Sequence, residues 1–252
     1  MVRLILLAQK PIGAQAFKIV STEPRIRIVA VVTNVLPGGW WGTADVAADA
    51  RRLGIPVIDN DRRNEGPILD AIAGGADFLL SVQHPWILSR TLIEAGPALN
   101  LHLGPLPEYR GFFGPTHAIL EGATTYGATL HWLAPEVDSG DIALEARFPI
   151  EPLDTALSLY NRAEIAGSAL VTDLVHRLAA VEAIPRRKQA AGGRAYGRLS
   201  LDNLREIRPG DDVDRKARAF FFPPHDPAYR VVEGVRIPVL PGSSGPGRDR
   251  RR

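Results

Sequence analysis

The sequence predicts an α/β fold built on a mostly parallel sheet. Apolar runs rich in valine, isoleucine and leucine alternate with segments of helical spacing through the first hundred residues. The first two runs, VRLILLA at residues 2–8 and IRIVAVVTN at residues 26–34, are typical of strands buried on both faces. Such alternation indicates βαβ units, in which helices cover both faces of a parallel sheet.

The remaining elements follow at short intervals. Thr43 is a plausible N-cap and Gly54 a plausible stop for the second helix. A polar C-terminal part is expected to hold one helix and a hairpin that turns at Glu233 and Gly234. After the first strand we predict, in order, a helix over 13–22, strand 26–34, helix 43–54, strand 55–58, helix 66–75, strands 77–82, 97–102, 126–133 and 142–148, and helices 155–180 and 212–219. The first half is therefore expected to be Rossmann-like.

Composition narrows the classes of function. The 252 residues are 45% hydrophobic and carry a net charge of only +2, as in an ordinary globular protein. The absence of cysteine excludes disulfides, thiolate metal sites and a cysteine nucleophile, and we predict no metal site. Four arginines lie in the last six residues, a basic end rather than a basic face, so nucleic-acid binding is not expected.

The N-terminal apolar run is broken by Gln9, Lys10 and Pro11. It is too short for a membrane span and lacks the pattern of a signal peptide, so we expect cytoplasmic residence and no membrane contact. We divide the chain into a main domain at residues 1–185, a small C-terminal lobe at 186–241 and a disordered basic tail at 242–252.

Three polar residues form the candidate chemical group. Asn100 and His102 end the fifth strand, where a two-residue period puts both side chains on one face and Leu101 on the other. Asp138 lies in the loop between the next two strands. An amide can donate to an oxyanion, an imidazole can move a proton, and a carboxylate can orient the imidazole or a water, which suits acyl transfer to an amine. Residue types alone leave the alternative that these groups only satisfy loop backbone.

Two stretches resemble the signatures of the folate-dependent formyltransferases. NLHLGPLPEYRG at residues 100–111 is similar to N-x-H-x-x-x-L-P-x-Y-R-G, and GATLHWLAPEVDSGDI at residues 127–142 is similar to G-x-T-x-H-x-x-x-x-x-V-D-x-G-x-I. The resemblance extends from about Leu4 to Ala180. It implies a Rossmann-like formyltransferase domain, an N10-formyltetrahydrofolate donor, and catalytic roles for Asn100, His102 and Asp138.

The resemblance also implies where the folate binds. In the family the pterin enters between the loop after the fourth strand and the loop that carries the aspartate. The corresponding cofactor-binding candidates here are Val82, Gln83, Trp86, Ile87 and Glu136. Trp86 and Ile87 would supply an apolar wall, with Trp86 as a core residue the alternative.

The acceptor candidates lie in three segments. Lys10 is placed to meet a diphosphate at the end of the first strand, and Phe221 and Phe222 to stack on a nucleobase. Arg110 would reach an acidic group, and Tyr229 belongs to FPPHDPAY, which resembles an element of sugar-nucleotide N-formyltransferases. The alternatives are a solvated Lys10, a surface Arg110 and an aromatic run that docks the lobe.

These features predict a sugar N-formyltransferase that acts in glycan or O-antigen biosynthesis. The expected acceptor is a dTDP-linked amino-dideoxy sugar such as dTDP-4-amino-4,6-dideoxyglucose, with a homodimer expected from the family. Methionyl-tRNA, glycinamide ribonucleotide or water as the acceptor, and a non-catalytic nucleotide-binding module, are the alternatives. Trp40 and Trp41, in the glycine loop GGWWG, would form a lid, a subunit contact or a loop anchor.

Overall fold

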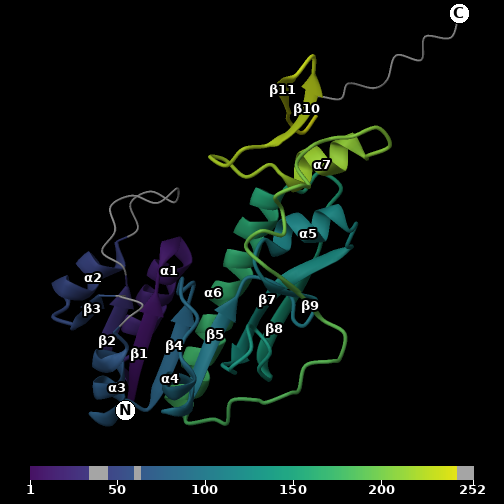
Figure 1. Ribbon diagram of the computed structural model, residues 1–252. Coiled ribbons are helices and arrows are strands. Elements are labelled where there is room, and N and C mark those ends of the chain that lie inside the picture. The colour runs from purple at the N-terminus through teal and green to yellow at the C-terminus, as the bar shows by residue number, and fades with distance from the viewer. Residues whose placement is uncertain (34–44, 60–63, 243–252) are drawn as a thin grey trace, which may run out of the picture.

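The computed structural model describes residues 1–33, 45–59 and 64–242, and these form an α/β fold around one seven-stranded sheet (Figure 1). The strand order is β3-β2-β1-β4-β5-β7-β8. The first five strands of this order run parallel, whereas β7 pairs antiparallel with β5 and with β8. The predicted fold class is therefore confirmed. The strands are β1 (Val2–Ala8), β2 (Ile26–Thr33), β3 (Val57–Asp59), β4 (Phe78–Val82), β5 (Ala98–His102), β7 (Thr125–Trp132) and β8 (Ile142–Pro149).

Helices cover both faces of the sheet. In β1, Leu4 and Leu6 belong to the core formed with α1 and α6, whereas Ile5 and Leu7 belong to the core under α3 and α4. Both kinds of position are fully buried, which explains why the strand is apolar at every residue from Leu4 onward. The helices are α1 (Lys10–Ser21), α2 (Val46–Arg52), α3 (Gly66–Ala73), α4 (Arg90–Glu94), α5 (Gly114–Leu120), α6 (Ala156–Ala180) and α7 (Val213–Ala219).

The long helix α6 leaves one face of β5 free for chemistry. Its N-terminus carries a capping box between Thr155 and Ser158. At Gly167 an added Cβ would lie 3.1 Å from atoms of Leu101 and Leu103, so this glycine lets the helix pack closely on the Leu101 face of β5. The opposite face, which carries Asn100 and His102, is not covered by α6.

The segment after α6 first meets the main sheet, where Arg187 bridges Ile142 of β8, and then continues to α7 and a hairpin. Residues 185–198, here called the strap, contain β9 (Arg194–Tyr196), which pairs with β6 (Tyr109–Gly111). Helix α7 then packs against α5, and the hairpin of β10 (Ala228–Val232) and β11 (Val235–Val239) protrudes beyond it (Figure 1). The hairpin turn lies at Glu233 and Gly234, as predicted, with both residues at positive φ.

Two helix starts differ from the predicted positions. Helix α1 begins at Lys10 because Pro11 fits the first turn, where its missing N–H costs nothing. Helix α2 is capped by Asp45, whose side chain accepts from the Ala48 N–H. The predicted cap Thr43, the tryptophans of GGWWG and residues 243–252 of the tail lie outside the described residues.

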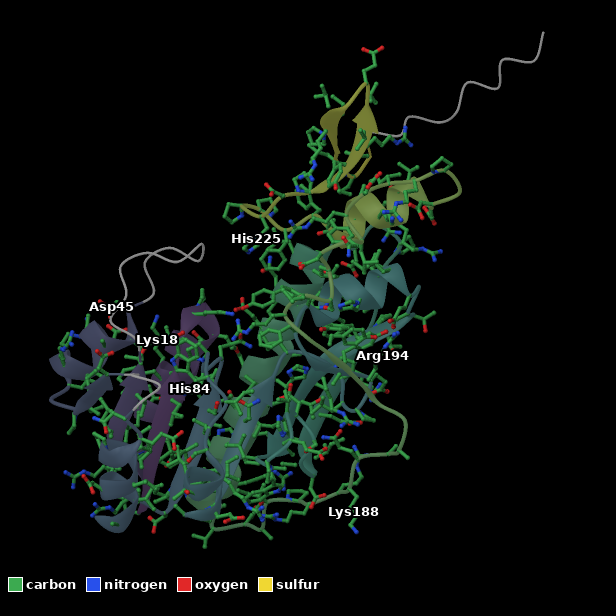
Figure 2. The ribbon with its side chains drawn as sticks, in the orientation of Figure 1. Lys18, Asp45, His84, Lys188, Arg194 and His225 are labelled. Carbon is green, nitrogen blue, oxygen red and sulfur yellow. The ribbon has the colours of Figure 1, made fainter. Side chains whose placement is uncertain are left out.

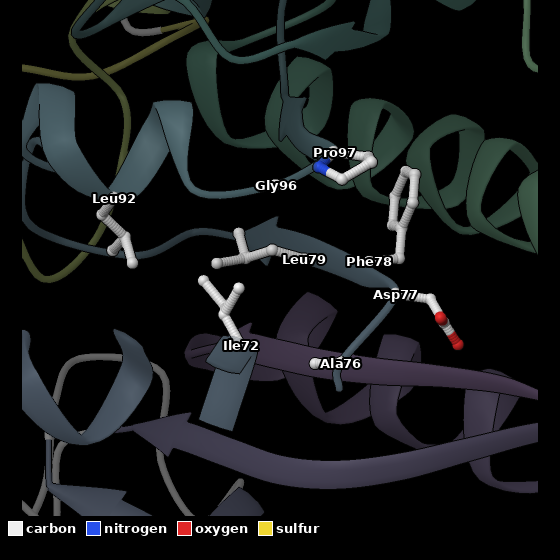
Figure 3. A pocket seen from close by; sticks show the side chains of 8 residues that line it. All are labelled: Ile72, Ala76, Asp77, Phe78, Leu79, Leu92, Gly96 and Pro97. Carbon is white, nitrogen blue, oxygen red and sulfur yellow. The ribbon is translucent and has the colours of Figure 1, made fainter. Parts of the chain in front are cut away.

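A small cavity lies at the amino ends of the parallel strands (Figure 3). It is lined mainly by apolar residues, among them Ile72, Phe78, Leu92 and Pro97. Ligands of parallel α/β sheets bind outside the carboxyl ends, so this cavity is on the wrong side for the predicted chemistry. In the described part of the chain, no helix has the length and apolar character needed to cross a membrane.

Candidate functional site

Asn100, His102 and Asp138 lie together on the face of β5 that faces away from α6. Asp138 Oδ2 is 3.4 Å from His102 Nδ1, and Asp138 Oδ1 is 3.3 Å from Nε2 of a second histidine, His131. The Asn100 amide nitrogen lies 3.1 Å from the same His131 Nε2. The structure thus joins the three predicted residues into one cluster through His131, which is only 1% exposed.

His131 is the central residue that the sequence analysis left without a role. It lies on β7 directly opposite Asn100 in the antiparallel ladder. Its Nδ1 is 2.9 Å from the Trp132 carbonyl oxygen. The histidine inside the second signature was the available signal, but its partner could be known only once β5 and β7 were paired.

The two nitrogens of His102 also have partners within the protein. Nε2 is 2.6 Å from the Tyr109 carbonyl oxygen, to which it donates, because a carbonyl can only accept. Nδ1 faces Asp138. An added Cβ at Gly104 would lie 2.7 Å from His102 Nε2, so only glycine leaves the ring in this position.

Electrostatics keep Asp138 ionised. Burial alone would raise the pKa of this carboxyl, but the positive charges of His102 and His131 in their protonated forms and the Gly111 N–H outweigh it and hold the pKa well below its usual range. The Gly111 N–H donates to Asp138 Oδ2 at 2.8 Å. A carboxylate with a fixed negative charge therefore faces both imidazoles.

Hydrogen bonds from Gln189 fix the backbone of the loop that carries Asp138. Asp138 itself has a φ of 50°, in the left-handed region that side chains other than glycine adopt at a cost. The Gln189 side-chain amide donates to the carbonyls of Asp138 and Gly140, at 2.8 and 2.7 Å. Gln189 lies on the strap, so the strap fixes the aspartate loop.

The predicted folate-binding residues divide into exposed and buried ones. Trp86 and Ile87 are 36% and 71% exposed, so neither is a core residue, and both are available to a ligand. Glu136 is exposed in the Asp138 loop. Val82 is fully buried, which leaves its backbone as the part able to meet a ligand. Gln83 instead accepts a hydrogen bond from Lys10 Nζ at 2.9 Å.

Lys10 belongs to a half-buried polar cluster at the carboxyl ends of β1 and β4. Burial lowers the pKa of Lys10, Glu164 opposes that change, and the charge of Arg198 adds to it. Burial raises the pKa of Glu164, while Tyr160 and Lys10 act in the opposite direction. Glu164 and Tyr160 both come from α6 and were not predicted, since nothing local in the sequence links them to Lys10.

The aromatic candidates are divided between this cluster and the hairpin. Phe222 packs edge-on against Tyr160, with ring centroids 5.3 Å apart, which puts it beside the Lys10 cluster. Phe221 is half-buried, and its carbonyl accepts from the Leu157 N–H. Tyr229 lies on β10, where the Arg236 guanidinium sits 4.7 Å from its ring centre. The structure therefore associates Phe222, but not Tyr229, with Lys10.

Arg198 lies close to the Lys10 cluster, whereas Arg110 precedes Gly111, the donor to Asp138. Arg110 is half-buried on β6, and among the described residues its buried Nε has no hydrogen-bond partner. Arg198, on the strap, was not predicted. Its guanidinium lies 4.3 Å from the ring centre of Phe112, and it donates to the Pro85 carbonyl at 3.3 Å. Arg198 thus bridges the loop after β4 and the loop after β6.

One half-buried histidine lies in the loop after β4. Among the described residues, His84 Nδ1 meets no hydrogen-bond partner, and burial lowers the pKa of this ring to about 4. The side chain is labelled in Figure 2 together with Arg194 of the strap and His225 of the segment beyond α7. His84 is therefore a neutral group near pH 7.

Known proteins resemble this chain in sequence and in fold. A model of the formyl transferase family matches residues 59–175. A methionyl-tRNA formyltransferase of Paracoccus denitrificans is 30% identical over 213 residues, which cover 79% of this chain and 69% of that protein. The chain spans about 60% of the length of two methionyl-tRNA formyltransferases from Geobacillus that it also matches.

Two solved structures share the fold over nearly all of this chain. A 4-N formyltransferase from Francisella tularensis superposes with a TM-score of 0.78 at 19% identity, over 95% of this chain and 96% of that one. An N-formyltransferase from Helicobacter canadensis, in complex with folinic acid and dTDP-3-aminofucose, gives 0.69 at 19% identity, over 94% and 86% of the two chains. These structures show the shared fold, and the 30% identity to the Paracoccus denitrificans protein over 69% of its length shows that the chain belongs to the formyl transferase family.

Proposed function

We propose that the protein transfers a formyl group from N10-formyltetrahydrofolate to the amine of a dTDP-linked amino-dideoxy sugar, with dTDP-4-amino-4,6-dideoxyglucose as the acceptor. The observation that carries the proposal is the cluster of Asn100, His102 and Asp138 on the open face of β5. The product would serve glycan or O-antigen biosynthesis in the cytoplasm.

Each member of the cluster has a role in this reaction. The acceptor amine forms a bond to the formyl carbon, and the bond from that carbon to N10 breaks. Asn100 donates a hydrogen bond to the formyl oxygen as it becomes negative, and protonated His102 adds its positive charge. Asp138 holds His102 or a water, through which the proton lost by the amine moves toward N10.

The loop after β4 suits a folate. Trp86 and Ile87 expose apolar surface beside the carboxyl ends of the strands, where a flat pterin ring would find a wall. The loop also supplies backbone donors and acceptors for the ring edge. The Helicobacter canadensis relative was solved with folinic acid, a formylated folate, which supports the same class of donor here.

The Lys10 cluster suits a nucleotide-linked sugar. The charge of Arg198 lowers the pKa of Lys10 and that of Glu164 opposes it more strongly, so this end of the sheet holds two cations and one carboxylate. A diphosphate would pair with the two cations. Phe222 beside Tyr160 offers an aromatic surface for the base, and a solved relative contains dTDP-3-aminofucose.

Methionyl-tRNA is the second candidate acceptor. The observation that favours it is the 30% identity to a methionyl-tRNA formyltransferase. Methionyl-tRNA is a large anionic substrate. The solved structures that superpose on 95% of this chain include a sugar N-formyltransferase and a 4-N formyltransferase. The two candidates differ in the acceptor and share the formyl donor.

An assay with several acceptors decides between them. Purified protein with N10-formyltetrahydrofolate is followed for tetrahydrofolate release in the presence of dTDP-4-amino-4,6-dideoxyglucose, its 3-amino isomer, methionyl-tRNA, glycinamide ribonucleotide or no acceptor. We expect turnover with the 4-amino sugar and its loss in His102→Ala. Turnover only with methionyl-tRNA would overturn the sugar assignment, and turnover without an acceptor would indicate a hydrolase.

We also propose that the protein is a homodimer joined through the β10–β11 hairpin. The hairpin is joined to the preceding segment by the bridge between Glu206 and Tyr229, and a two-stranded sheet is marginal in water. Val232, Val235 and Ile237 share one face of this hairpin by their pairing, and they are 53%, 59% and 46% exposed; Arg230, opposite Ile237, lies on the same face. The hairpin protrudes from the body, so a second copy would cover these side chains.

A further inference from the structure

The orientation of the Asn100 side chain follows from a chain of hydrogen bonds that starts at a backbone carbonyl. The Trp132 carbonyl oxygen lies 2.9 Å from His131 Nδ1. A carbonyl only accepts, so the proton of a neutral His131 is on Nδ1 and its Nε2 is an acceptor. The tautomer of His131 is therefore set by the backbone of its neighbour in sequence.

The tautomer in turn orients the amide. His131 Nε2, as an acceptor, lies 3.1 Å from Asn100 Nδ2, which donates to it. The amide oxygen then points to the other side, where Ser81 Oγ lies 2.8 Å from it. An amide oxygen has only lone pairs, so the Ser81 hydroxyl must be the donor.

His131 alone does not hold the amide in this orientation. Asp138 Oδ1 lies 3.3 Å from the same Nε2, so the carboxylate competes with Asn100 for this nitrogen whenever His131 carries a second proton. The Ser81 hydroxyl makes an independent bond at the opposite end of the amide. Because a serine hydroxyl can donate or accept, His131 selects which end of the amide faces β7, and the Ser81 bond anchors the other end on β4.

Ser81 is itself rigidly placed. It lies on β4 directly beside Asn100 in the parallel ladder, and its residue is only 3% exposed. A serine in a strand that is otherwise Phe78, Leu79, Leu80 and Val82 is the one polar side chain of β4. A buried hydroxyl of this kind needs a partner, and Asn100 provides it.

We propose that Ser81 is a positioning residue for formyl transfer, which fixes the Asn100 carboxamide with its nitrogen toward the reacting group. This inference rests on the proposed function. With one amide N–H on His131, the second can donate to the formyl oxygen. An amide turned by half a rotation would present its oxygen there instead, and two electron-rich oxygens would repel each other as charge develops.

Steady-state kinetics of Ser81→Ala test the role, with Ser81→Thr as the conservative variant. We expect Ser81→Ala to lower kcat by roughly 10- to 100-fold, less than the 10²–10³ of a lost oxyanion donor, since Asn100 is still present but free to turn. The KM values for both substrates should stay within about twofold, and Ser81→Thr should recover most of kcat because it retains the hydroxyl. Ser200→Ala is the matched control, because its hydroxyl bonds another buried histidine, His117, away from the cluster.

A second measurement is independent of any acceptor. In wild-type protein bound to 5-formyltetrahydrofolate, NMR should show a nuclear Overhauser effect between the Asn100 side-chain amide protons and the His131 ring, assigned with Asn100→Asp. Ser81→Ala should bind the same folate and weaken this effect. A wild type without the effect, or a Ser81→Ala protein with unchanged kcat, overturns the role of Ser81. Wild-type protein that shows the effect and forms no product with any acceptor refutes the proposed function alone.

Discussion

At the scale of single residues, the charge of Asp138 links activity to stability. We expect Asp138→Asn to lower kcat by roughly 10²- to 10⁴-fold, the usual contribution of a group that moves or orients a proton. The pKa of Asp138 is lower in the folded protein than the value of about 3.9 for an unfolded chain. Its stabilising contribution is therefore present above that value and is lost as the pH falls through the folded pKa.

Calorimetry checks the sign of this effect. Asp138→Asn should unfold at a lower temperature than wild type at pH 7, and the difference should shrink as the pH is lowered below about 4. Asp173→Asn, which removes an exposed partner of Arg177 on α6, should change little at either pH. If Asp138→Asn lowered the unfolding temperature equally at pH 7 and pH 3, the lowered pKa of Asp138 would be contradicted.

Arg198 and Arg194 provide a matched pair on the strap. Arg198 stacks on Phe112 beside the Lys10 cluster, whereas Arg194 stacks on Tyr196 and faces Glu121. If an anionic acceptor binds at this end of the sheet, Arg198→Ala should raise the KM for that acceptor about tenfold and leave the KM for the folate unchanged. Initial rates measured over a range of acceptor and of folate concentrations, at two salt concentrations, give these KM values.

Arg194→Ala is the control for Arg198→Ala. Arg194→Ala should leave both KM values close to those of wild type. Equal effects of the two substitutions would mean that the strap acts through its overall charge, and a loss of kcat alone in Arg198→Ala would exclude a binding role.

At the scale of secondary-structure elements, the pairing of β6 with β9 supports the site. Gly111 has a φ of +84°, and an added Cβ would lie 2.4 Å from the Tyr196 carbonyl oxygen. Its N–H is also the donor to Asp138. Gly111→Ala should therefore destabilise the fold by roughly 2 kcal/mol or more and lower activity, as the clash separates the two strands.

Gly192 separates the cost of a positive φ from the cost of the clash with Tyr196. It also lies on the strap at positive φ, 93°, but an added Cβ meets nothing within 4 Å. Gly192→Ala should cost only the backbone penalty of about 1 kcal/mol and should keep full activity. Urea unfolding of both variants gives the comparison, and equal losses would show that close approach at Gly111 is unimportant.

The elements also show why some features could be predicted and others not. The two-residue spacing of Asn100 and His102 placed both on one face because that period is local to a strand. Helix α5 was missed because Gly114 and Pro115 suggest a turn, although proline here fits the first helical turn. Glu164, Arg198 and Ser81 depend on strand order and on the course of the strap, which no local pattern records.

At the scale of the whole molecule, the hairpin predicts the oligomeric state. Val235→Asp puts a charge directly opposite Val232, on the face that also carries Ile237 and Arg230, and it should convert a dimer to a monomer. Arg236 lies on the opposite face, against Tyr229, so Arg236→Asp should leave the dimer intact. Light scattering coupled to gel filtration measures both, and a monomeric wild type would refute this interface.

The pairing of Gly111 with Tyr196 has a consequence for the order in which the protein matures on the ribosome. The strands of the main sheet, Asn100, His102 and Asp138 are all synthesised before the strap. Gln189, which binds the Asp138 loop, and Tyr196, which holds β6, emerge later. A nascent chain arrested before residue 189 would thus carry the proposed catalytic side chains without the contacts that hold them, so we expect catalytic competence to arise only late in translation.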